Sequence, residues 1–153
     1  MDKNILIKSH QEMIDFGKKT ASFLKKGDII ALTGELGAGK TVFVKGLAQG
    51  LNISEEPGSP SFVIINEYKG EAPLYHFDVY RLDNTKQMYD LGYEEYFYSE
   101  GITVIEWAEK IESLIEGEYL KITISYTDNE DERKIELEPK GDMIKGRVEK
   151  CIF

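Results

Sequence analysis

The chain has 153 residues, a formal net charge of −9 and a hydrophobic fraction of 41%. This length suits one domain with a sizeable core, so we expect residues 1–153 to form a single domain. The acidic balance argues against a protein that grips nucleic acid by a basic stripe of its own. If the chain serves a nucleic-acid pathway, we expect another subunit to hold the nucleic acid.

The sequence also indicates where the protein works. Its apolar runs are all much shorter than the roughly 20 residues of a membrane span. The first residues lack the basic and long apolar regions of a signal peptide, and Cys151 is the only cysteine. Because a lone cysteine cannot form an internal disulfide, we expect a cytoplasmic protein without membrane contact.

The first predicted elements are a strand over residues 5–8 and a helix that begins at a capping box. Ser9 and Glu12 supply the S-x-x-E pattern of that box. Gly27 is expected to end the helix. The expected core contacts of the helix are Met13, Phe16, Ala21, Phe23 and Leu24.

The most specific motif of the chain follows. Residues 34–41 match G-x-x-x-x-G-K-T, the phosphate-binding loop of P-loop proteins. The apolar run at 28–33 has the length of a buried strand, and residues 42–49 favour a helix that Gly50 would end. Phosphate binding requires a strand, a glycine loop and a helix in this order.

The chemistry of this loop assigns roles to its residues. Gly34, Gly37 and Gly39 let successive backbone N–H groups turn toward phosphate oxygens, and the helix N-terminus adds partial positive charge. Lys40 is placed to reach the β- and γ-phosphates, and the Thr41 hydroxyl to bind Mg²⁺. The sequence therefore predicts a site for a nucleoside triphosphate with its Mg²⁺ ion.

The middle of the chain predicts strands and short helices. After an exposed loop over residues 52–60, strands are expected at 62–68 and 74–78. A turn at 69–71 would join these strands as a hairpin. The next expected elements are a short helix near 86–91, a fully apolar strand at 102–105 and a helix at 108–115.

The last predicted elements are antiparallel strands at 119–127 and 134–138 on either side of an acidic turn. Alternation places on the core face Leu120, Ile122, Ile124, Tyr126, Ile135 and Leu137. The order of all elements predicts an α/β protein with a three-layer fold like that of P-loop nucleoside triphosphatases. We expect a mixed, mostly parallel sheet flanked by helices, with the antiparallel hairpin at its C-terminal end.

Two acidic residues, Asp78 and Glu106, end apolar strands. P-loop enzymes need a carboxylate near the metal, offered from a strand end across from the loop. The residues alone leave open which acid approaches Mg²⁺ and which orients a water. Ser61 or Ser59, in the loop before the first acid, is a candidate hydroxyl ligand for the γ-phosphate and Mg²⁺.

Three neighbours of these acids are further candidates. His76 shares a strand face with Asp78, so it is a candidate to orient that carboxylate. Trp107, the only tryptophan, is a candidate brace for Glu106 or a partner contact, although core packing is the simpler interpretation. Arg81 is a candidate γ-phosphate contact, with a surface ion pair as its simpler role.

Four motifs together resemble the TsaE family, also called YjeE, of small bacterial ATPases. They are G-E-L-G-A-G-K-T at 34–41, S-P-S-F at 59–62, H-F-D-V-Y-R-L at 76–82 and I-E-W-A at 105–108. The resemblance spans about residues 5–140. Ser61 stands where the family usually has Thr, which keeps the hydroxyl group. Residues 141–153 match no part of the family pattern.

The resemblance implies a P-loop α/β fold and a role in forming threonylcarbamoyladenosine at position 37 of tRNA. It implies that the chain binds and hydrolyses ATP with Mg²⁺ while it is bound to the proteins TsaD and TsaB. Those partners would transfer the threonylcarbamoyl group and hold the tRNA. Contact between this chain and tRNA would then be indirect.

The resemblance also implies roles for single residues. Lys40 contacts the phosphates, Glu106 joins Thr41 at Mg²⁺, and Asp78 lies near the γ-phosphate and its water. Lys40, Asp78 and Glu106 are thus the catalytic candidates, and Thr41, Glu106 and Ser61 are the metal candidates. The nucleotide-binding candidates are Gly34, Gly37, Ala38, Gly39, Lys40, Thr41, Val42 and Asp78, with His10 and Arg133 on the adenine side.

Two other functions stay open at this point. A small-molecule kinase usually needs several arginines to neutralise two sets of phosphates, and the chain has only Arg81, Arg133 and Arg147. A non-catalytic assembly factor, whose affinity for a partner is set by bound nucleotide, would need the same loop without turnover. The absence of an N-K-x-D motif argues against GTP.

Overall fold

The computed structural model of the protein describes residues 3–55, 57 and 64–151. The described strands are β1 (Lys3–Ile7), β2 (Ile29–Gly34), β3 (Ile65–Tyr68), β4 (Leu74–Asp78), β5 (Ile102–Glu106), β6 (Tyr119–Tyr126) and β7 (Arg133–Lys140). The α-helices are α1 (His10–Phe23), α2 (Lys40–Gly50), α3 (Lys86–Asp90), α4 (Tyr93–Phe97) and α5 (Asp142–Glu149). Two 3₁₀ turns, η1 (Ala108–Lys110) and η2 (Glu112–Leu114), follow β5.

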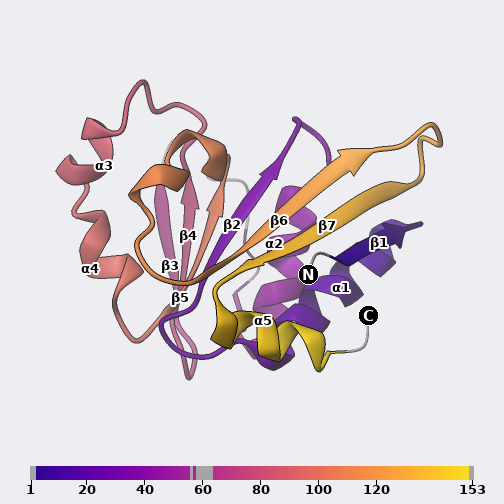
Figure 1. Ribbon diagram of the computed structural model, residues 1–153, viewed down its shortest axis with the longest axis horizontal. Coiled ribbons are helices and arrows are strands. Elements are labelled where there is room, and N and C mark those ends of the chain that lie inside the picture. The colour runs from indigo at the N-terminus through magenta and orange to yellow at the C-terminus, as the bar shows by residue number, and fades with distance from the viewer. Residues whose placement is uncertain (1–2, 56, 58–63, 152–153) are drawn as a thin grey trace.

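The seven described strands form one sheet in the order β1-β7-β6-β2-β5-β4-β3 (Figure 1). The pairs β6–β2, β2–β5 and β5–β4 are parallel, and the pairs β1–β7, β7–β6 and β4–β3 are antiparallel. Because β1 runs against β7, and β7 runs against β6, β1 points the same way as the parallel strands. Only β3 and β7 point the other way. The predicted mixed, mostly parallel sheet with its C-terminal hairpin is confirmed.

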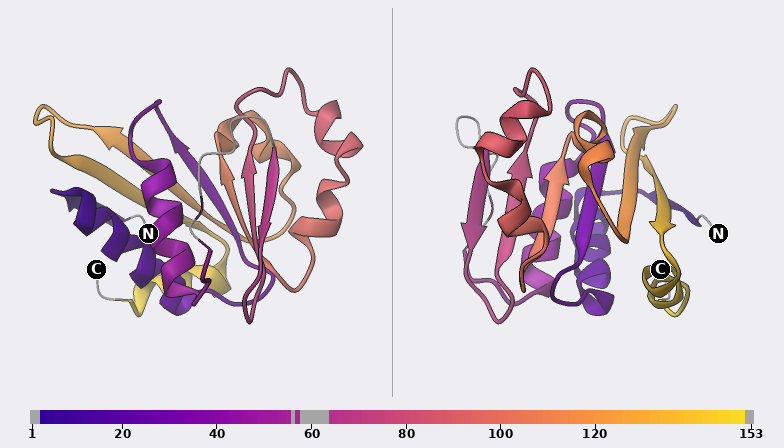
Figure 2. Two further views of the ribbon diagram at one scale, coloured as in Figure 1. Left: turned by 180° about the vertical axis from the view of Figure 1, so that it is seen from behind. Right: turned by 60° about the vertical axis from the view of Figure 1, so that its left-hand side comes forward.

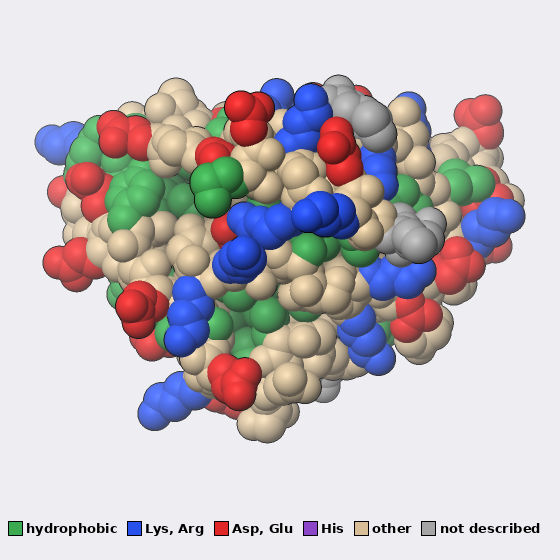
Figure 3. Space-filling model, turned by 60° about the horizontal axis from the view of Figure 1, so that its bottom comes forward, with side chains coloured by type: hydrophobic (Ala, Val, Ile, Leu, Met, Phe, Trp, Pro, Cys, Tyr) green, Lys and Arg blue, Asp and Glu red, His purple; other side chains and the backbone are tan. Residues whose placement is uncertain are grey.

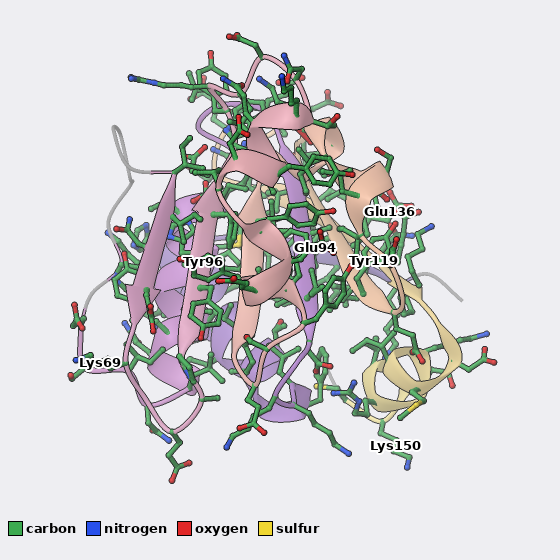
Figure 4. All side chains as sticks on the ribbon, turned by 90° about the vertical axis from the view of Figure 1, so that its left-hand side faces the viewer. Lys69, Glu94, Tyr96, Tyr119, Glu136 and Lys150 are labelled. Atoms are coloured by element: carbon green, nitrogen blue, oxygen red, sulfur yellow. The ribbon has the colours of Figure 1, made fainter. Side chains whose placement is uncertain are left out.

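Helices cover both faces of this sheet and complete three layers (Figure 2). On one face, α1 and α2 pack over a core that contains Phe43, Leu47 and Ile122. On the other face, a separate core contains Phe77, Phe97 and Ile105 and is covered by α3, α4 and the turns after β5. Figure 4 looks onto this second face, where the Tyr96 ring of α4 packs edge-on against Tyr75 and Phe77.

The helix α2 is fixed on α1 by a close contact of backbones. A Cβ atom on Gly46 would lie 2.2 Å from the carbonyl oxygen of Ile14, and one on Gly17 would lie 2.5 Å from that of Phe43. Only glycine permits this approach. The rings of Phe16 and Phe43 pack beside it with centroids 5.4 Å apart. Since α2 begins at the phosphate loop, this contact also positions the loop.

The hairpin β6–β7 shows why alternating residues predict strands well. Leu120, Ile122, Ile124, Ile135 and Leu137 are all buried, as expected from the pattern. Tyr126 is the exception, because its side chain is 45% exposed. It lies at the end of β6, and its hydroxyl donates a 2.6 Å hydrogen bond to the carbonyl of Leu36.

Helix ends differ from their predicted positions. The helix α1 ends at Phe23 because Leu24 takes an extended conformation, three residues before Gly27. At the end of α2, Gly50 is still helical, and Asn52 with a φ of +59° turns the chain. Phe23 and Leu24 are half-buried against the core cluster.

The predicted helix at 108–115 is wrong, since η1 and η2 occupy that segment. Ile111 interrupts them with a φ of −133°, which no α-helix accommodates. Sequence patterns also missed α4 and α5. The helix α4 is only 5 residues long, and α5 has two buried residues, Ile144 and Val148.

Charged side chains of both signs lie on the surface. On the face shown in Figure 3, Lys and Arg side chains gather across the middle, and Asp and Glu side chains flank them. Within the described part of the chain, every helix is too short or too polar to cross a membrane.

Candidate nucleotide site

The phosphate loop leaves the carboxyl end of β2 and enters α2 at the upper edge of the sheet in Figure 1. Its bend needs glycine at position 37, where φ is +78° and the hydroxyl of Tyr126 fills the space of a Cβ, 2.8 Å away. The same hydroxyl holds the Leu36 carbonyl. The loop is therefore fastened to the end of β6 as well as to its own flanking elements.

Lys40 begins α2, and its side chain is folded back over the loop. Its ammonium group donates hydrogen bonds to the carbonyl oxygens of Gly34 and Glu35. It also lies 3.6 Å from the ring centroid of Trp107, a cation–π distance. Burial lowers the pKa of Lys40, and the nearby carboxylates of Glu106, Glu109 and Asp78 oppose that shift.

Trp107 reaches Lys40 because of an unusual backbone conformation. Its φ of +63° is one of only two positive values among non-glycine residues of the described chain. The left-handed conformation costs an L-residue about 1–2 kcal/mol and is held only when the surroundings demand it. Here it turns the chain sharply after β5 and lays the indole beside the phosphate loop.

Glu106 lies at the centre of the site and is only 3% exposed. One carboxylate oxygen, Oε2, is 2.5 Å from Nε2 of the fully buried His76. The other oxygen, Oε1, is 3.5 Å from the Thr41 hydroxyl. The parallel pairing of β4 with β5 brings His76 and Glu106 together. His76 thus orients Glu106, whereas the sequence suggested Asp78 as its partner.

The Nδ1 atom of His76 is buried and has no hydrogen-bond partner among the described residues. Among the described residues, the imidazole ring is therefore held only through the bond from Nε2 to Glu106. If Nε2 carries the proton, it donates to one carboxylate oxygen and leaves Oε1 directed at Thr41.

Asp78 pairs in register with Glu106 across β4 and β5. Its Oδ1 accepts a 3.1 Å hydrogen bond from the backbone N–H of Tyr80. Burial is the largest cause of a raised pKa for Asp78, and the charge of Glu106 raises it further. The bond from Tyr80 and the charge of Lys40 act in the opposite direction. A carboxyl with a raised pKa is suited to proton transfer.

Two adjoining cavities follow the phosphate loop. The first, of about 240 Å³, contains Lys40, Thr41, Asp78, Glu106 and Trp107. The second, of about 270 Å³, lies at the other side of the loop. Both cavities are lined by Gly37, Gly39 and Val42. The two cavities therefore adjoin along the loop, and Lys40, Asp78 and Glu106 line the first of them.

The second cavity brings together the predicted adenine-side residues. His10 at the start of α1 and Arg133 at the start of β7 both line it, beside Ala38 of the loop. The Arg133 guanidinium donates to the backbone carbonyls of Glu130 and Glu132 and lies 4.5 Å from the centroid of the Tyr126 ring. Arg133 is thus held in place at the wall of this cavity.

The remaining predictions have different outcomes. Ser59 and Ser61 lie outside the described residues. Within the described part of the chain, no group of three or more His, Cys, Asp or Glu side chains could hold a metal ion. Mg²⁺ commonly binds through one or two protein oxygens, with phosphates and waters as its other ligands. Thr41 and Glu106 are oxygen donors of this kind.

Sequence reasoning missed two contacts that shape the site. Alternation predicts that Tyr126 lies in the core, and the sequence offers Trp107 as a brace for Glu106 and not for Lys40. The polar hydroxyl of Tyr126, at the end of β6, could have indicated that this side chain lies outside the core. No sequence signal showed the second, because it depends on the backbone turn after β5.

The chain is similar to known proteins in sequence and in fold. A family model described as threonylcarbamoyl adenosine biosynthesis protein TsaE matches residues 7–135. The chain belongs to the TsaE family.

Relatives with the name tRNA threonylcarbamoyladenosine biosynthesis protein TsaE match most of the chain. The protein of Bacillus subtilis is 47% identical over 126 residues, which cover 82% of this chain and 78% of the relative. The protein of Haemophilus influenzae is 36% identical over 131 residues, with 82% of each chain covered. The crystal structure of YdiB from Bacillus subtilis superposes with a TM-score of 0.84 at 39% identity, covering 97% of this chain and 93% of that one.

The match to the TsaE model includes every described site residue from His10 to Arg133. The helix α5, at Asp142–Glu149, lies beyond it. Arg147 of this helix forms a two-pronged ion pair with Asp28, with contacts of 2.6 and 3.0 Å. The pair ties the C-terminal helix to the residue before β2.

Proposed function

We propose that the chain is an ATP-binding, Mg²⁺-dependent ATPase of the machinery that forms threonylcarbamoyladenosine at position 37 of tRNA. In this proposal it acts in the cytoplasm with TsaD and TsaB and meets tRNA only through them. Membership in the TsaE family supports the pathway. The observation that carries the nucleotide chemistry is the meeting of Lys40, Thr41 and Glu106 in one cavity at the end of the phosphate loop.

Each residue of this cavity would have its own role in ATP binding and hydrolysis. The loop amides and the N-terminus of α2 would bind the α- and β-phosphates. Thr41 and Glu106 would hold Mg²⁺, which when bound neutralises phosphate charge. Lys40 would exchange the carbonyls of Gly34 and Glu35 for phosphate oxygens. Asp78 would orient the attacking water and accept its proton. His10 and Arg133 would contact the adenine.

The folded-back position of Lys40 favours one alternative. A lysine that already has backbone and aromatic partners must give them up to bind phosphate, so nucleotide binding rearranges Gly34, Glu35 and Trp107. Such a coupling between nucleotide and loop is what a nucleotide-gated assembly factor needs. In that function ATP would strengthen the complex with TsaD and TsaB without turnover.

The test is ATP hydrolysis by the purified chain, with and without the TsaD–TsaB pair. Lys40→Ala is the blank, and Lys69→Ala, in the β3–β4 turn at the opposite end of the sheet, is the matched control. We expect weak activity alone, a rise with the partners, and loss only in Lys40→Ala. Absence of turnover in both conditions, with ATP still strengthening the complex, would favour the gated assembly factor.

A further inference from the structure

A third cavity, of about 430 Å³, lies beside the phosphate loop at the carboxyl ends of β2 and β6. Its lining residues are Thr33, Gly34, Glu35, Trp107, Glu109 and the β6 segment 123–126. It shares only Trp107 with the cavity of Lys40 and no residue with the cavity of His10. A nucleotide bound along the loop therefore leaves this space open.

The chemistry of the third cavity suits a cation. Two carboxylates, Glu35 and Glu109, line it and are exposed. Neither forms a side-chain hydrogen bond or ion pair with any residue that the structure describes. Trp107 and Tyr126 also line it, with Lys40 already beside the first ring and Arg133 beside the second. Carboxylates beside aromatic rings bind a planar guanidinium especially well, through paired hydrogen bonds and cation–π contact.

Arg133, whose guanidinium lies beside the Tyr126 ring of this cavity, already has other partners. Arg133 is held by the carbonyls of Glu130 and Glu132 and by the Tyr126 ring. Arg147 lies away from it, paired with Asp28 before the start of β2. We propose that the cavity between Trp107 and Tyr126 is a docking socket for an arginine side chain of a partner protein. This inference rests on the proposed function in one respect, namely that the chain works in a complex.

The socket is linked to the nucleotide site by two contacts. Gly34 and Glu35 line the socket, and their carbonyl oxygens accept the hydrogen bonds of Lys40. Trp107 lines both cavities, and its ring lies against the Lys40 ammonium. An arginine that enters the socket thus touches the residues that hold Lys40 back. Docking and nucleotide binding would influence each other through this lysine.

The direct test uses the isolated chain and N-acetyl-arginine amide as the probe. Trp107 is the only tryptophan, so its fluorescence reports on the socket wall. The control probe is N-acetyl-citrulline amide, which has nearly the same shape without the charge. We expect a saturable change with the arginine probe only, and about tenfold weaker binding in Glu109→Gln. Equal changes with both probes, no saturable change, or an unaltered Glu109→Gln would overturn the proposal.

A second experiment measures binding of the chain to the TsaD–TsaB pair. Glu109→Arg is compared with Glu71→Arg, which makes the same charge change in the β3–β4 turn. We expect Glu109→Arg to weaken the complex about tenfold and Glu71→Arg to leave it unchanged. Equal affinities of the two variants would overturn the socket. If the wild-type chain does not bind the pair, the proposed function fails, and the arginine titration still decides the inference.

Discussion

Buried charge around Lys40 dominates the site at the residue scale. The ammonium of Lys40 and the carboxyl groups of Asp78 and Glu106 share a cavity of about 240 Å³. Each of these groups loses water on folding, and their mutual attraction repays only part of that loss. We expect bound phosphates and Mg²⁺ to make this arrangement more favourable.

His76 should control metal binding through Glu106. In His76→Leu the carboxylate loses its buried partner, so we expect the Mg²⁺ concentration that half-saturates nucleotide binding to rise about tenfold or more. ATP binding without Mg²⁺ should change little. A fluorescent ATP analogue titrated at several Mg²⁺ concentrations measures both quantities, and His76→Gln, which keeps a donor, should recover part of the loss. An unaltered Mg²⁺ requirement in a folded His76→Leu protein would refute this role.

Asp78 should reduce stability at neutral pH. Burial raises its pKa above the ordinary value of 3.8. When folding raises the pKa of a carboxyl group, the protein loses stability as the pH rises from the pKa in the unfolded state to the pKa in the folded state. The full loss is present at any pH above both pKa values. We therefore expect Asp78→Asn to raise the melting temperature at pH 7. The gain should shrink as the pH falls toward 3.8, and a gain independent of pH would contradict this cause.

The contact of α1 with α2 matters most at the element scale. Its glycines bring the two backbones together, and α2 carries the phosphate loop at its first turn. We therefore expect a change in this contact to act on stability and on nucleotide binding together.

The variant Gly46→Ala tests this coupling. The added methyl group would meet the carbonyl oxygen of Ile14 at 2.2 Å, so helices must move apart. We expect a loss of about 1–3 kcal/mol in unfolding free energy, together with weaker ATP binding. Gly146→Ala on α5 is the matched control, because nothing lies within 4 Å of its added methyl group. Urea unfolding measures the unfolding free energy of both variants. Equal values would show that the contact between α1 and α2 can accommodate a methyl group.

At the scale of the whole molecule, the distribution of charge bears on whether the chain can bind tRNA by itself. The chain carries a net charge of −9, and acidic side chains flank the basic ones on the face in Figure 3. Binding of a protein alone to tRNA depends on releasing counterions by clustered lysines and arginines. We expect no binding of the isolated chain to tRNA at about 0.15 M salt in a filter-binding or gel-shift assay. Saturable binding at that salt would contradict an indirect role.

The sequence predicted the whole-molecule architecture better than its details. Strands with alternating or continuous apolar residues, such as 74–78 and 119–126, were placed almost to the residue, because burial on known faces dictates their pattern. The segment 108–115 was misjudged, since the left-handed backbone at Trp107 and the break at Ile111 override helix propensity. The short helix α4 packs Tyr96 and Phe97 against Phe77 of the sheet, a contact that no local pattern reveals.

Some features of the candidate site could be predicted from the sequence, and others depended on the fold. The phosphate loop and the strand-end acids were predictable because their chemistry requires fixed residue types at fixed places. The pairing of His76 with Glu106 instead of Asp78 depended on strand order, which places β4 beside β5. The contact of Trp107 with Lys40 depended on a single backbone angle.

The proposed function requires that Lys40, Thr41 and Glu106 form one site for ATP with Mg²⁺. Calorimetric titration of the isolated chain with ATP, with and without Mg²⁺, tests it most directly. We predict saturable binding that Mg²⁺ strengthens, that Lys40→Ala weakens about tenfold or more, and that Lys69→Ala leaves unchanged. Equal affinity of Lys40→Ala and Lys69→Ala for ATP would show that Lys40 does not bind the nucleotide.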